Sequence, residues 1–436
     1  MAAPMTLHAP DRRAFLRRTG LALAAGAILP ALDAAPNAAV AATEDPDLLF
    51  KAGNFHAAER GYRRQLRKDP RDAHALAQLG YLALLTNRFG AAEQHLSKAL
   101  ALRPGDVASA QRLAECFVRQ DRLARAVPLL KGIDRPRDQA LAKLYSHVGG
   151  TPWQLHGAQS ARVPFVTLDP VPAVEASLNG GAPGTFWLDT YATLDLSKEV
   201  AERAGLRAVA TMPGGVANNQ PINIWLGVLD SFKIGNVEIR NLPVQWSDAQ
   251  RPPLPDGTAA AGAFGTTIFY HFLTTMDYAG RALTLRPRSK AGSRAHAADR
   301  LPLWLAGDHY PCTLGSLGDY GPRMATVDTG GIASGLDTTV EIAERAGGIT
   351  VDHDHPIEQP GGNKLYPITA ERISLGRAVG RDVPGHAAEK VFPGFPGPGQ
   401  SAQFGFDLIA NFTHEFFKPY AITFDYTAMR LTITRG

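Results

Sequence analysis

The second half of the chain carries the same pattern twice, and this duplication constrains the fold more than any other feature of the sequence. Asp189-Thr190 and Asp328-Thr329 each follow a hydrophobic run, 139 positions apart. Further matches follow in the same order at offsets of 140 to 148 residues: Ala201–Gly205 with Ala343–Gly347, Ile234-Gly235 with Leu375-Gly376, Pro243 with Pro384, Phe264-Gly265 with Phe404-Gly405, and Thr275–Leu285 with Thr423–Ile433. Such steady offsets indicate an internal duplication, so the sequence predicts two lobes of one architecture.

Both halves of the duplication are expected to be rich in β-strands. After residue 146 the helical periodicity ends, and short runs rich in Val, Thr, Ile and Phe alternate with turns of Gly, Pro and Asn. We assign the first lobe to residues 160–287 and the second lobe to residues 301–436. The polar segment 288–300 contains few bulky apolar residues and is expected to link them.

The repeated aspartates offer a chemistry that neither could perform alone. Asp189 and Asp328 hold equivalent positions in the two halves, so a symmetric fold would bring their carboxyl groups face to face. Carboxyl groups about 3 Å apart cannot both ionise, and a pair that shares one proton can activate a water molecule. Such a pair titrates as a unit, so acid and base are roles of the pair rather than of either residue.

The order of these segments resembles the retropepsin-like aspartic proteases, and two fused lobes in one chain resemble the bilobal pepsin arrangement. The resemblance extends over residues 163–436, and its most specific part is Val327–Gly331 at the end of an apolar run. It implies an endopeptidase that hydrolyses peptide bonds of a peptide or protein substrate with a water held between Asp189 and Asp328. It also implies a reaction that needs no metal and no organic cofactor.

The resemblance assigns supporting roles to residues around the two aspartates. Thr190 and Thr329 are expected to bond across the pseudo-twofold axis and fix the separation of the two loops. Gly330 is expected to let the backbone approach a carboxylate. Gly265 and Gly405, each preceded by phenylalanine, are expected to cross behind the loops and support them.

Tyr191 departs from this pattern, because the position after Asp189-Thr190 is a glycine in the family. Glycine accepts backbone angles that other residues resist, and it leaves room for the facing loop or the substrate. A tyrosine ring that entered the cleft would either block the two aspartates or narrow the substrate pocket. Two functions therefore remain open: an active protease of unusual specificity, or a catalytically inactive pseudoprotease that acts as a periplasmic protein-binding scaffold.

Two further segments are weaker candidates for function. Asp352–His355 alternates aspartate with histidine, as a strand presenting metal ligands would, although a solvated loop has the same composition. Phe392–Gly399 is expected either to rim the cleft or to form a plain turn. The chain shows no Gly-x-Ser-x-Gly motif, no Walker loop and no cysteine–histidine nucleophile pair, so the sequence gives no support for those enzyme classes.

Residues 45–145 differ from the rest of the chain, because they are rich in Ala, Leu and Arg and repeat with a period of 34. The recurring positions are Phe55, Phe89 and Leu123; Ala58, Ala92 and Ala126; Tyr62, Leu96 and Leu130; and Pro70 and Pro104. Helix pairs that pack through small alanines produce this pattern, which resembles the tetratricopeptide repeat. The resemblance implies an array that binds a protein or peptide partner. A short array can instead pack against the catalytic half as a brace, and both roles remain open.

The first 42 residues are expected to be a targeting segment rather than part of the fold. Asp11–Arg18 contains an Arg-Arg-x-Phe-Leu sequence, an apolar stretch follows, and Ala39-Val40-Ala41 offers the small residues of a cleavage site. This order resembles a twin-arginine signal peptide and predicts a periplasmic or secreted protein. No later apolar run reaches the roughly 18 residues that span a bilayer, so no membrane span is expected in the mature chain.

The remaining composition is that of an ordinary globular protein. The net charge of +4 is small and no block of like charge occurs, so nothing indicates nucleic-acid binding. Cys116 and Cys312 lie 196 positions apart in different predicted domains and are expected to be buried thiols. The sequence therefore predicts a multidomain chain: an N-terminal all-α tetratricopeptide array followed by a mainly-β bilobal acid-protease-like domain pair.

Overall fold

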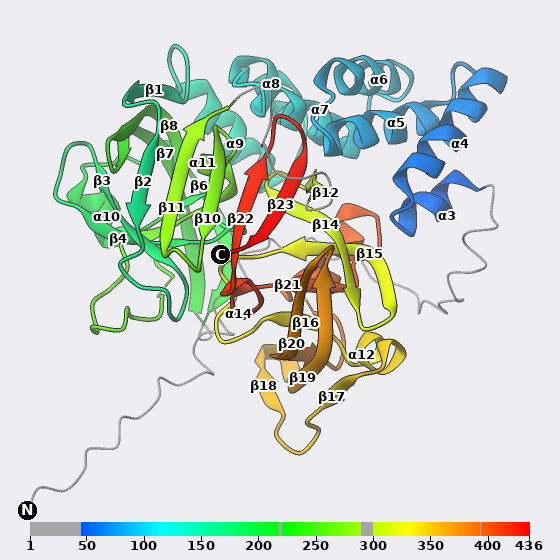
Figure 1. Cartoon of the computed structure of the whole chain (residues 1–436). Coiled ribbons are helices and arrows are strands. Elements are labelled where there is room, and N and C mark those ends of the chain that lie inside the picture. The colour runs from blue at the N-terminus through cyan, green and yellow to red at the C-terminus, as the bar shows by residue number, and fades with distance from the viewer. Residues whose placement is uncertain (1–44, 218–219, 250, 289–299, 393) are drawn as a thin grey trace, which may run out of the picture.

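The computed structural model describes residues 45–217, 220–249, 251–288, 300–392 and 394–436. The predicted signal peptide and most of the predicted linker lie outside these residues. The described chain forms a helical array over residues 46–147, followed by two β-rich lobes (Figure 1). The predicted fold class is therefore confirmed. None of the described helices combines the length and the apolar character that crossing a bilayer requires.

The array is a series of antiparallel helices, several of which start at an aspartate cap. The carboxylates of Asp72 and Asp106 accept hydrogen bonds from the amides of Ala75 and Ser109, which satisfies amides that have no partner within the helix. The alanines that recur every 34 residues are fully buried between helices. The described helices of the array are α3 (Pro46–Lys51), α4 (Phe55–Lys68), α5 (Ala73–Leu85), α6 (Phe89–Leu102), α7 (Val107–Val118), α8 (Leu123–Lys131) and α9 (Pro136–His147).

Lobe 1 is built on a sheet with the strand order β1-β8-β5-β9-β4-β3-β7-β6. Alternate residues of β8 face the core, which is the burial expected of a strand with one covered face. The elements of this lobe are β1 (Gln154–Gly157), β2 (Ala161–Pro164), β3 (Ala173–Leu178), β4 (Gly184–Leu188), β5 (Leu194–Ser197), α10 (Lys198–Arg203), β6 (Ala210–Ala217), β7 (Gln220–Ile234), β8 (Val237–Ser247), β9 (Gly262–Phe264), α11 (Thr266–Phe269), β10 (Phe272–Asp277) and β11 (Ala282–Pro287).

Lobe 2 has a sheet of its own, with the order β13-β14-β15-β21-β16-β20-β19-β17 and β18 beside β19. Its elements are β12 (Arg300–Pro302), β13 (Trp304–Ala306), β14 (Tyr310–Leu317), β15 (Tyr320–Val327), β16 (Leu336–Thr339), α12 (Val340–Ala346), β17 (Ile349–Val351), β18 (Ile357–Gln359), η2 (Pro360–Gly362), β19 (Asn363–Leu375), β20 (Ala378–Ala388), η3 (Gly397–Gln400), α13 (Ser401–Phe404), β21 (Ala410–Phe412), α14 (His414–Phe417), β22 (Tyr420–Asp425) and β23 (Arg430–Arg435).

A six-stranded sheet, ordered β12-β23-β22-β10-β11-β2, joins the two lobes. Strand β10 of lobe 1 pairs antiparallel with β22 of lobe 2, with Thr275 directly opposite Thr423 and their hydroxyl oxygens 2.8 Å apart. These threonines are equivalent positions of the duplicated sequence. A residue that pairs with its own counterpart marks a pseudo-twofold axis, so the sequence duplication is expressed as symmetry between the lobes.

One of the sequence matches is wrong. In lobe 1, β4 and β9 run parallel with Leu188 opposite Phe264, and in lobe 2, β15 and β21 run parallel with Val327 opposite Phe412. The structural counterpart of Phe264 is therefore Phe412 rather than Phe404. The mismatch arises because 21 residues separate β20 from β21, whereas 14 separate β8 from β9. The longer connection contains η3 and α13, which have no equivalent among the described residues of lobe 1.

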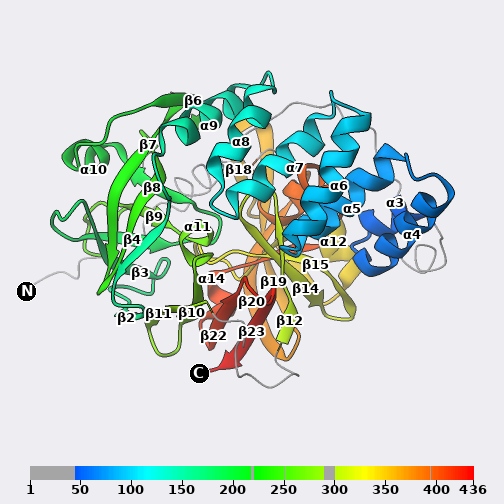
Figure 2. The same cartoon turned by 90° about the horizontal axis from the view of Figure 1, so that it is seen from above.

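The array packs along both lobes and bridges them (Figure 2). On lobe 2, Phe50, Phe55 and Tyr81 share a buried apolar cluster with Trp304 and Phe406. The Phe55 ring meets Trp304 and Phe406 edge-on, at centroid distances of 5.4 and 5.1 Å. On lobe 1, α9 packs against β6 and β7. The array thus contacts both lobes of its own chain, as a brace would.

Arg119, just after α7, makes a buried polar contact across this interface. Its side chain is buried, and Nη2 donates to the carbonyl oxygens of Leu305 at 3.2 Å and Gly307 at 2.8 Å. Nε pairs with Glu115 at 2.7 Å, which fixes the guanidinium group to its own helix. Cys116, on the same helix, is a buried free thiol, as is Cys312 in lobe 2, which agrees with the sequence.

Candidate active site

The two aspartates stand at the ends of equivalent strands. Strand β4 ends directly before Asp189 and β15 ends directly before Asp328. The Asp189 amide donates to the carbonyl oxygen of Phe264 at 3.0 Å, and the Asp328 amide donates to that of Phe412 at 2.8 Å. The same backbone bond thus fixes each aspartate to the strand beside it, and the pseudo-twofold axis brings the two loops together.

Thr190 and Thr329 lock the two loops to each other. The Thr190 amide donates to Oγ1 of Thr329 at 3.0 Å, and the Thr329 amide donates to Oγ1 of Thr190 at 3.1 Å. Each hydroxyl also donates across the axis, to the carbonyl oxygen of Val327 or Leu188. All of these groups are buried, so the bonds are shielded from competing water. The structure places both threonines where the sequence predicted them.

Gly330 and Gly265 both lie against Asp189. A Cβ atom at Gly330 would collide with the Asp189 carboxyl group, and one at Gly265 would collide with the Asp189 backbone oxygen. Both close approaches therefore require glycine.

The prediction for Gly405 is wrong. This glycine ends α13 with a φ of +79° and faces the array, where a Cβ atom on it would lie 3.6 Å from the Phe50 ring. The error follows from the false match of Phe404 with Phe264 across the longer lobe 2 connection. Thr413, which follows Phe412, holds the position that corresponds to Gly265.

The carboxyl groups of Asp189 and Asp328 are within hydrogen-bonding reach of each other. Each also accepts the amide two residues further on: Tyr191 donates to Oδ1 of Asp189 at 2.7 Å, and Gly330 donates to Oδ1 of Asp328 at 2.8 Å. Burial raises the pKa of Asp189. Burial, together with the neighbouring Asp189 charge, raises the pKa of Asp328 well above its usual range. The pair is therefore arranged to hold one proton between two carboxyl groups.

The Tyr191 ring forms part of a wall and does not separate the two carboxyl groups. Its hydroxyl lies 2.9 Å from Oε1 of Gln400 and 3.2 Å from Oδ1 of Asn411, both in lobe 2. The ring meets Tyr310 edge-on with centroids 4.9 Å apart. Asp189, Tyr191 and Asp328 line one common cavity. Tyr191 thus lines the cavity beside the two aspartates, and its hydroxyl is bonded to lobe 2.

Asn411 supports one aspartate of the pair and was not identified from the sequence. Its Nδ2 donates to Oδ2 of Asp328 at 3.0 Å and to Oδ2 of Asp337 at 3.1 Å. Thr326 donates to Oδ1 of the same amide at 2.8 Å, which fixes its orientation. The equivalent position in lobe 1 is Ala263, so the pair is asymmetric. Extending the 148-residue offset of the terminal hairpin back to Ala263 and Phe264 would have identified Asn411.

A second pair of carboxylates flanks the first and was also missed. Asp195 lies opposite Ala263, and Asp337 lies opposite Asn411, so the two aspartates are equivalent. Asp337 accepts a hydrogen bond from the Ser334 hydroxyl at 2.9 Å and lies 3.5 Å from Nδ1 of His386.

The aspartates open onto a cavity of about 140 Å³ between the lobes. Arg251 and Asp195 border it on the lobe 1 side, where Nη2 of Arg251 donates to the Asp195 carbonyl oxygen at 3.3 Å. His386 and Asp337 border it on the lobe 2 side. The apolar walls include Trp187, Ile332, Leu365, Phe392 and Phe395. Phe392, Gly394, Phe395 and Pro396 therefore line the cleft, which is one of the two roles expected from the sequence for their segment.

A chain of polar contacts leads from the array to the Asp189 loop. Arg137 of α9 pairs with Asp308, and Asp308 lies 2.7 Å from Nδ1 of His309. Nε2 of His309 lies 2.7 Å from the Tyr191 carbonyl oxygen. Burial alone would lower the pKa of His309, but the Asp308 carboxylate raises it, which favours the protonated ring that pairs with Asp308.

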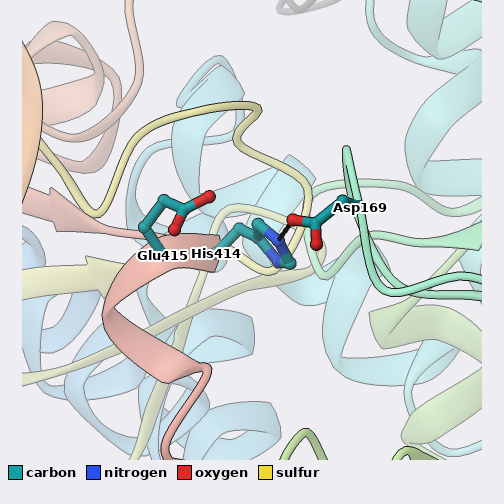
Figure 3. Close-up of side chains that lie close together, drawn as sticks. All are labelled: Asp169, His414 and Glu415. Carbon is teal, nitrogen blue, oxygen red and sulfur yellow. Dashed lines mark hydrogen bonds and ion pairs between the residues drawn. The ribbon is translucent and has the colours of Figure 1, made fainter.

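The metal-ligand candidates from the sequence do not gather around one point. Asp352 and His355 form a local ion pair at the surface, 2.9 Å apart. Within the described residues, three potential ligands come together at Asp169, His414 and Glu415 instead (Figure 3). There Nζ of Lys418 lies 2.6 Å from Asp169 and 2.8 Å from Glu415. The lysine ammonium pairs with both carboxylates, and the group acts as an ionic contact between the lobes.

Comparisons with known proteins identify two parts of the chain. The family described as aspartyl protease matches residues 174–268, and the tetratricopeptide repeat family matches residues 83–147. No curated protein shows significant similarity to the chain. Among solved structures, a mutant O-GlcNAc transferase from Thermobaculum terrenum is 23% identical over 27% of this chain and 24% of its own, with a TM-score of 0.23. The matched region thus spans about a quarter of that transferase. The chain therefore combines a segment that matches the aspartyl protease family with tetratricopeptide repeats.

Proposed function

We propose that this protein is an aspartic endopeptidase in which Asp189 and Asp328 activate the attacking water. The proposal is carried by the contact of the two carboxyl groups, which lie within hydrogen-bonding reach and line the same cavity. A hydrogen bond between two carboxyl groups requires a proton on one of them, which is the state that general acid–base catalysis needs. The reciprocal threonine bonds hold this separation fixed, so the geometry is organised before substrate arrives.

In the proposed reaction, the ionised carboxyl group takes a proton from a water bound between the pair. The water oxygen attacks the scissile carbonyl carbon, while the protonated carboxyl group donates its proton to the carbonyl oxygen. The C–N bond of the tetrahedral intermediate then breaks, and the leaving nitrogen accepts the proton that the water gave up. As the C–N bond breaks, one of the two hydroxyl groups of the intermediate loses its proton to the aspartate pair and becomes the carbonyl of the new carboxyl terminus. The pair then again holds one proton, and one water has been consumed.

The array is proposed to brace the two lobes and to bind a protein or peptide partner. Helices α3, α4, α5 and α9 contact the lobes, so a partner is expected on the surface of the array that these contacts leave exposed. The proposal of export by the twin-arginine route, to the periplasm or out of the cell, rests on residues 1–42 alone.

The test of the proposal is cleavage of a peptide library by the purified full chain between about pH 3 and pH 7. Mass spectrometry of the products should show internal cleavage that a statine-type inhibitor suppresses. Asp328→Asn should be inactive, and Asp352→Asn, at an exposed aspartate far from the pair in sequence, should retain full activity. A folded wild-type protein that cleaves no peptide over this range would contradict the proposal.

The alternative function is a binding protein without catalysis, and the observation that favours it is Tyr191. The ring occupies the place of the family glycine and contributes to a cavity of only about 140 Å³. Such a scaffold would bind the inhibitor or a peptide without hydrolysing it. Tight inhibitor binding by wild-type protein, combined with no cleavage in the library, would support this alternative.

A further inference from the structure

A second hollow lies on lobe 2 and shares no lining residue with the dyad cavity. Its volume is about 670 Å³. The residues that line it are Arg372, Arg377, Ala378, Val379, Arg381, Tyr420, Ile433, Thr434 and Arg435. Four of these nine residues are arginines and none is acidic. The hollow is therefore a concentrated site of positive charge.

The strand register forces two of these arginines together. Arg372 on β19 is the direct cross-strand partner of Arg381 on β20. Like charges opposite each other on neighbouring strands destabilise a sheet. Among the ion pairs of the described residues, none involves Arg372, Arg381 or Arg435. Both arginines are exposed, and within the described chain Nη1 of Arg372 donates only to the Gly318 carbonyl oxygen, at 3.5 Å, so an anion from solution can reach their charge.

Tyr420 brings a third arginine to the same place. Its hydroxyl lies 2.9 Å from both the amide nitrogen and the carbonyl oxygen of Val379, which ties β22 to β20. Arg435 on β23 is the cross-strand partner of Tyr420. The hairpin of β22 and β23 therefore delivers Arg435 to the hollow that Arg372 and Arg381 border.

The charge of the hollow stands out against that of the lobes. Residues 148–436 contain 23 Lys and Arg against 27 Asp and Glu, so the two lobes together are net acidic. Guanidinium groups present a planar set of donors that matches the oxygens of a phosphate, and several of them facing one space recognise a multiply charged anion. The volume falls in the range of sites for small organic ligands and exceeds what one inorganic phosphate would fill.

We propose that this hollow on lobe 2 binds a ligand that carries phosphate groups, held by Arg372, Arg381 and Arg435. The bound phosphate would offset the repulsion across β19 and β20. A soluble organic phosphate and the headgroup of an anionic phospholipid present the same chemistry. The proposal does not depend on catalysis at the aspartate pair.

The test uses the purified full chain and the double variant Arg372→Ala with Arg381→Ala. Binding of inorganic pyrophosphate is measured by calorimetry, and binding to phosphatidylglycerol vesicles is measured by sedimentation against phosphatidylcholine vesicles. The matched control is Arg430→Ala, an exposed arginine on β23 outside the hollow. We expect wild type and control to bind alike, and the double variant to bind at least about tenfold more weakly, with binding that weakens at high salt.

A loss confined to pyrophosphate would identify a soluble phosphate ligand, and a loss confined to the vesicles would identify a lipid headgroup. The melting temperature measured without ligand distinguishes the loss of a binding site from a folding defect. Because the mutation removes a repulsion, the unliganded double variant should melt at or above the wild-type temperature. Equal binding by wild type and double variant, or no binding of either probe by wild type, would overturn the proposal.

Discussion

The hydroxyl of Tyr191 lies 3.2 Å from Oδ1 of Asn411, the residue whose amide nitrogen donates to Asp328. Tyr191 comes from the lobe 1 loop and Asn411 from β21 of lobe 2. Neither residue has an equivalent in the opposite lobe, where Gly330 and Ala263 stand. Tyr191, which departs from the family pattern, therefore contacts the residue that donates to Asp328. The two lobes contribute different residues to the site, so the site is asymmetric.

Tyr191→Gly is expected to destabilise the protein and not to raise its activity. The substitution removes the edge contact with Tyr310 and the bonds to Gln400 and Asn411, and a large-to-small change of this kind costs about 3–5 kcal/mol. Tyr191→Phe removes the hydroxyl alone and should cost about 1 kcal/mol. Urea unfolding checks both values. A glycine variant that is as stable as wild type and more active would show that the ring obstructs the site.

Asn411→Ala is expected to shift the pH dependence of activity. A hydrogen bond to an ionised carboxylate favours the charged form, so its removal raises the pKa of the pair. The acidic limb of the kcat/KM profile should therefore move to higher pH. Losing one bond to a charged group should also lower kcat/KM by about 10-fold or more. Asn236→Ala, at an exposed turn, is the control, and an unchanged profile in Asn411→Ala would contradict this role.

His309→Gln is expected to destabilise the protein mainly at acid and neutral pH. Despite its burial, the neighbouring Asp308 raises the pKa of His309. A raised pKa contributes stability that is complete below the unfolded value of about 6.5 and is lost as pH rises through the folded value. The difference in unfolding free energy between wild type and His309→Gln should therefore be larger at pH of about 5.5 than at about 9. A difference that is constant or grows with pH would contradict this assignment.

Arg119→Ala is expected to loosen the array from lobe 2. The substitution leaves the carbonyl oxygens of Leu305 and Gly307 without their donor and leaves Glu115 without its partner. Breaking a buried ion pair from one side costs about 3–5 kcal/mol. Limited proteolysis should then cut between array and lobes faster than in wild type. Arg125→Ala, at an exposed arginine, is the control and should be cut at the wild-type rate. Equal rates of proteolysis in both variants would contradict the role of Arg119 in holding the array against lobe 2.

The sequence predicted those parts of the fold that depend on local spacing. The 34-residue period predicted the array, and the placement of Asp189 and Asp328 after apolar runs predicted where the loops meet. The match of Phe404-Gly405 with Phe264-Gly265 failed, because the longer connection between β20 and β21 happens to contain a Phe-Gly pair 140 residues after Phe264-Gly265. The 148-residue offset could have matched Asn411 to Ala263, but its contact with Asp328 arises only when β15, β16 and β21 are paired, which the offset does not encode.

The most direct test of the central claim is the pH dependence of kcat/KM for one cleaved peptide, measured for wild type, Asp189→Asn and Asp328→Asn. A pair that shares one proton predicts a bell-shaped profile for wild type, with one limb for each ionisation. It also predicts that both asparagine variants lose at least about 10³-fold in rate, since neither carboxyl group works alone. Full activity in either variant would contradict an active site built on Asp189 and Asp328.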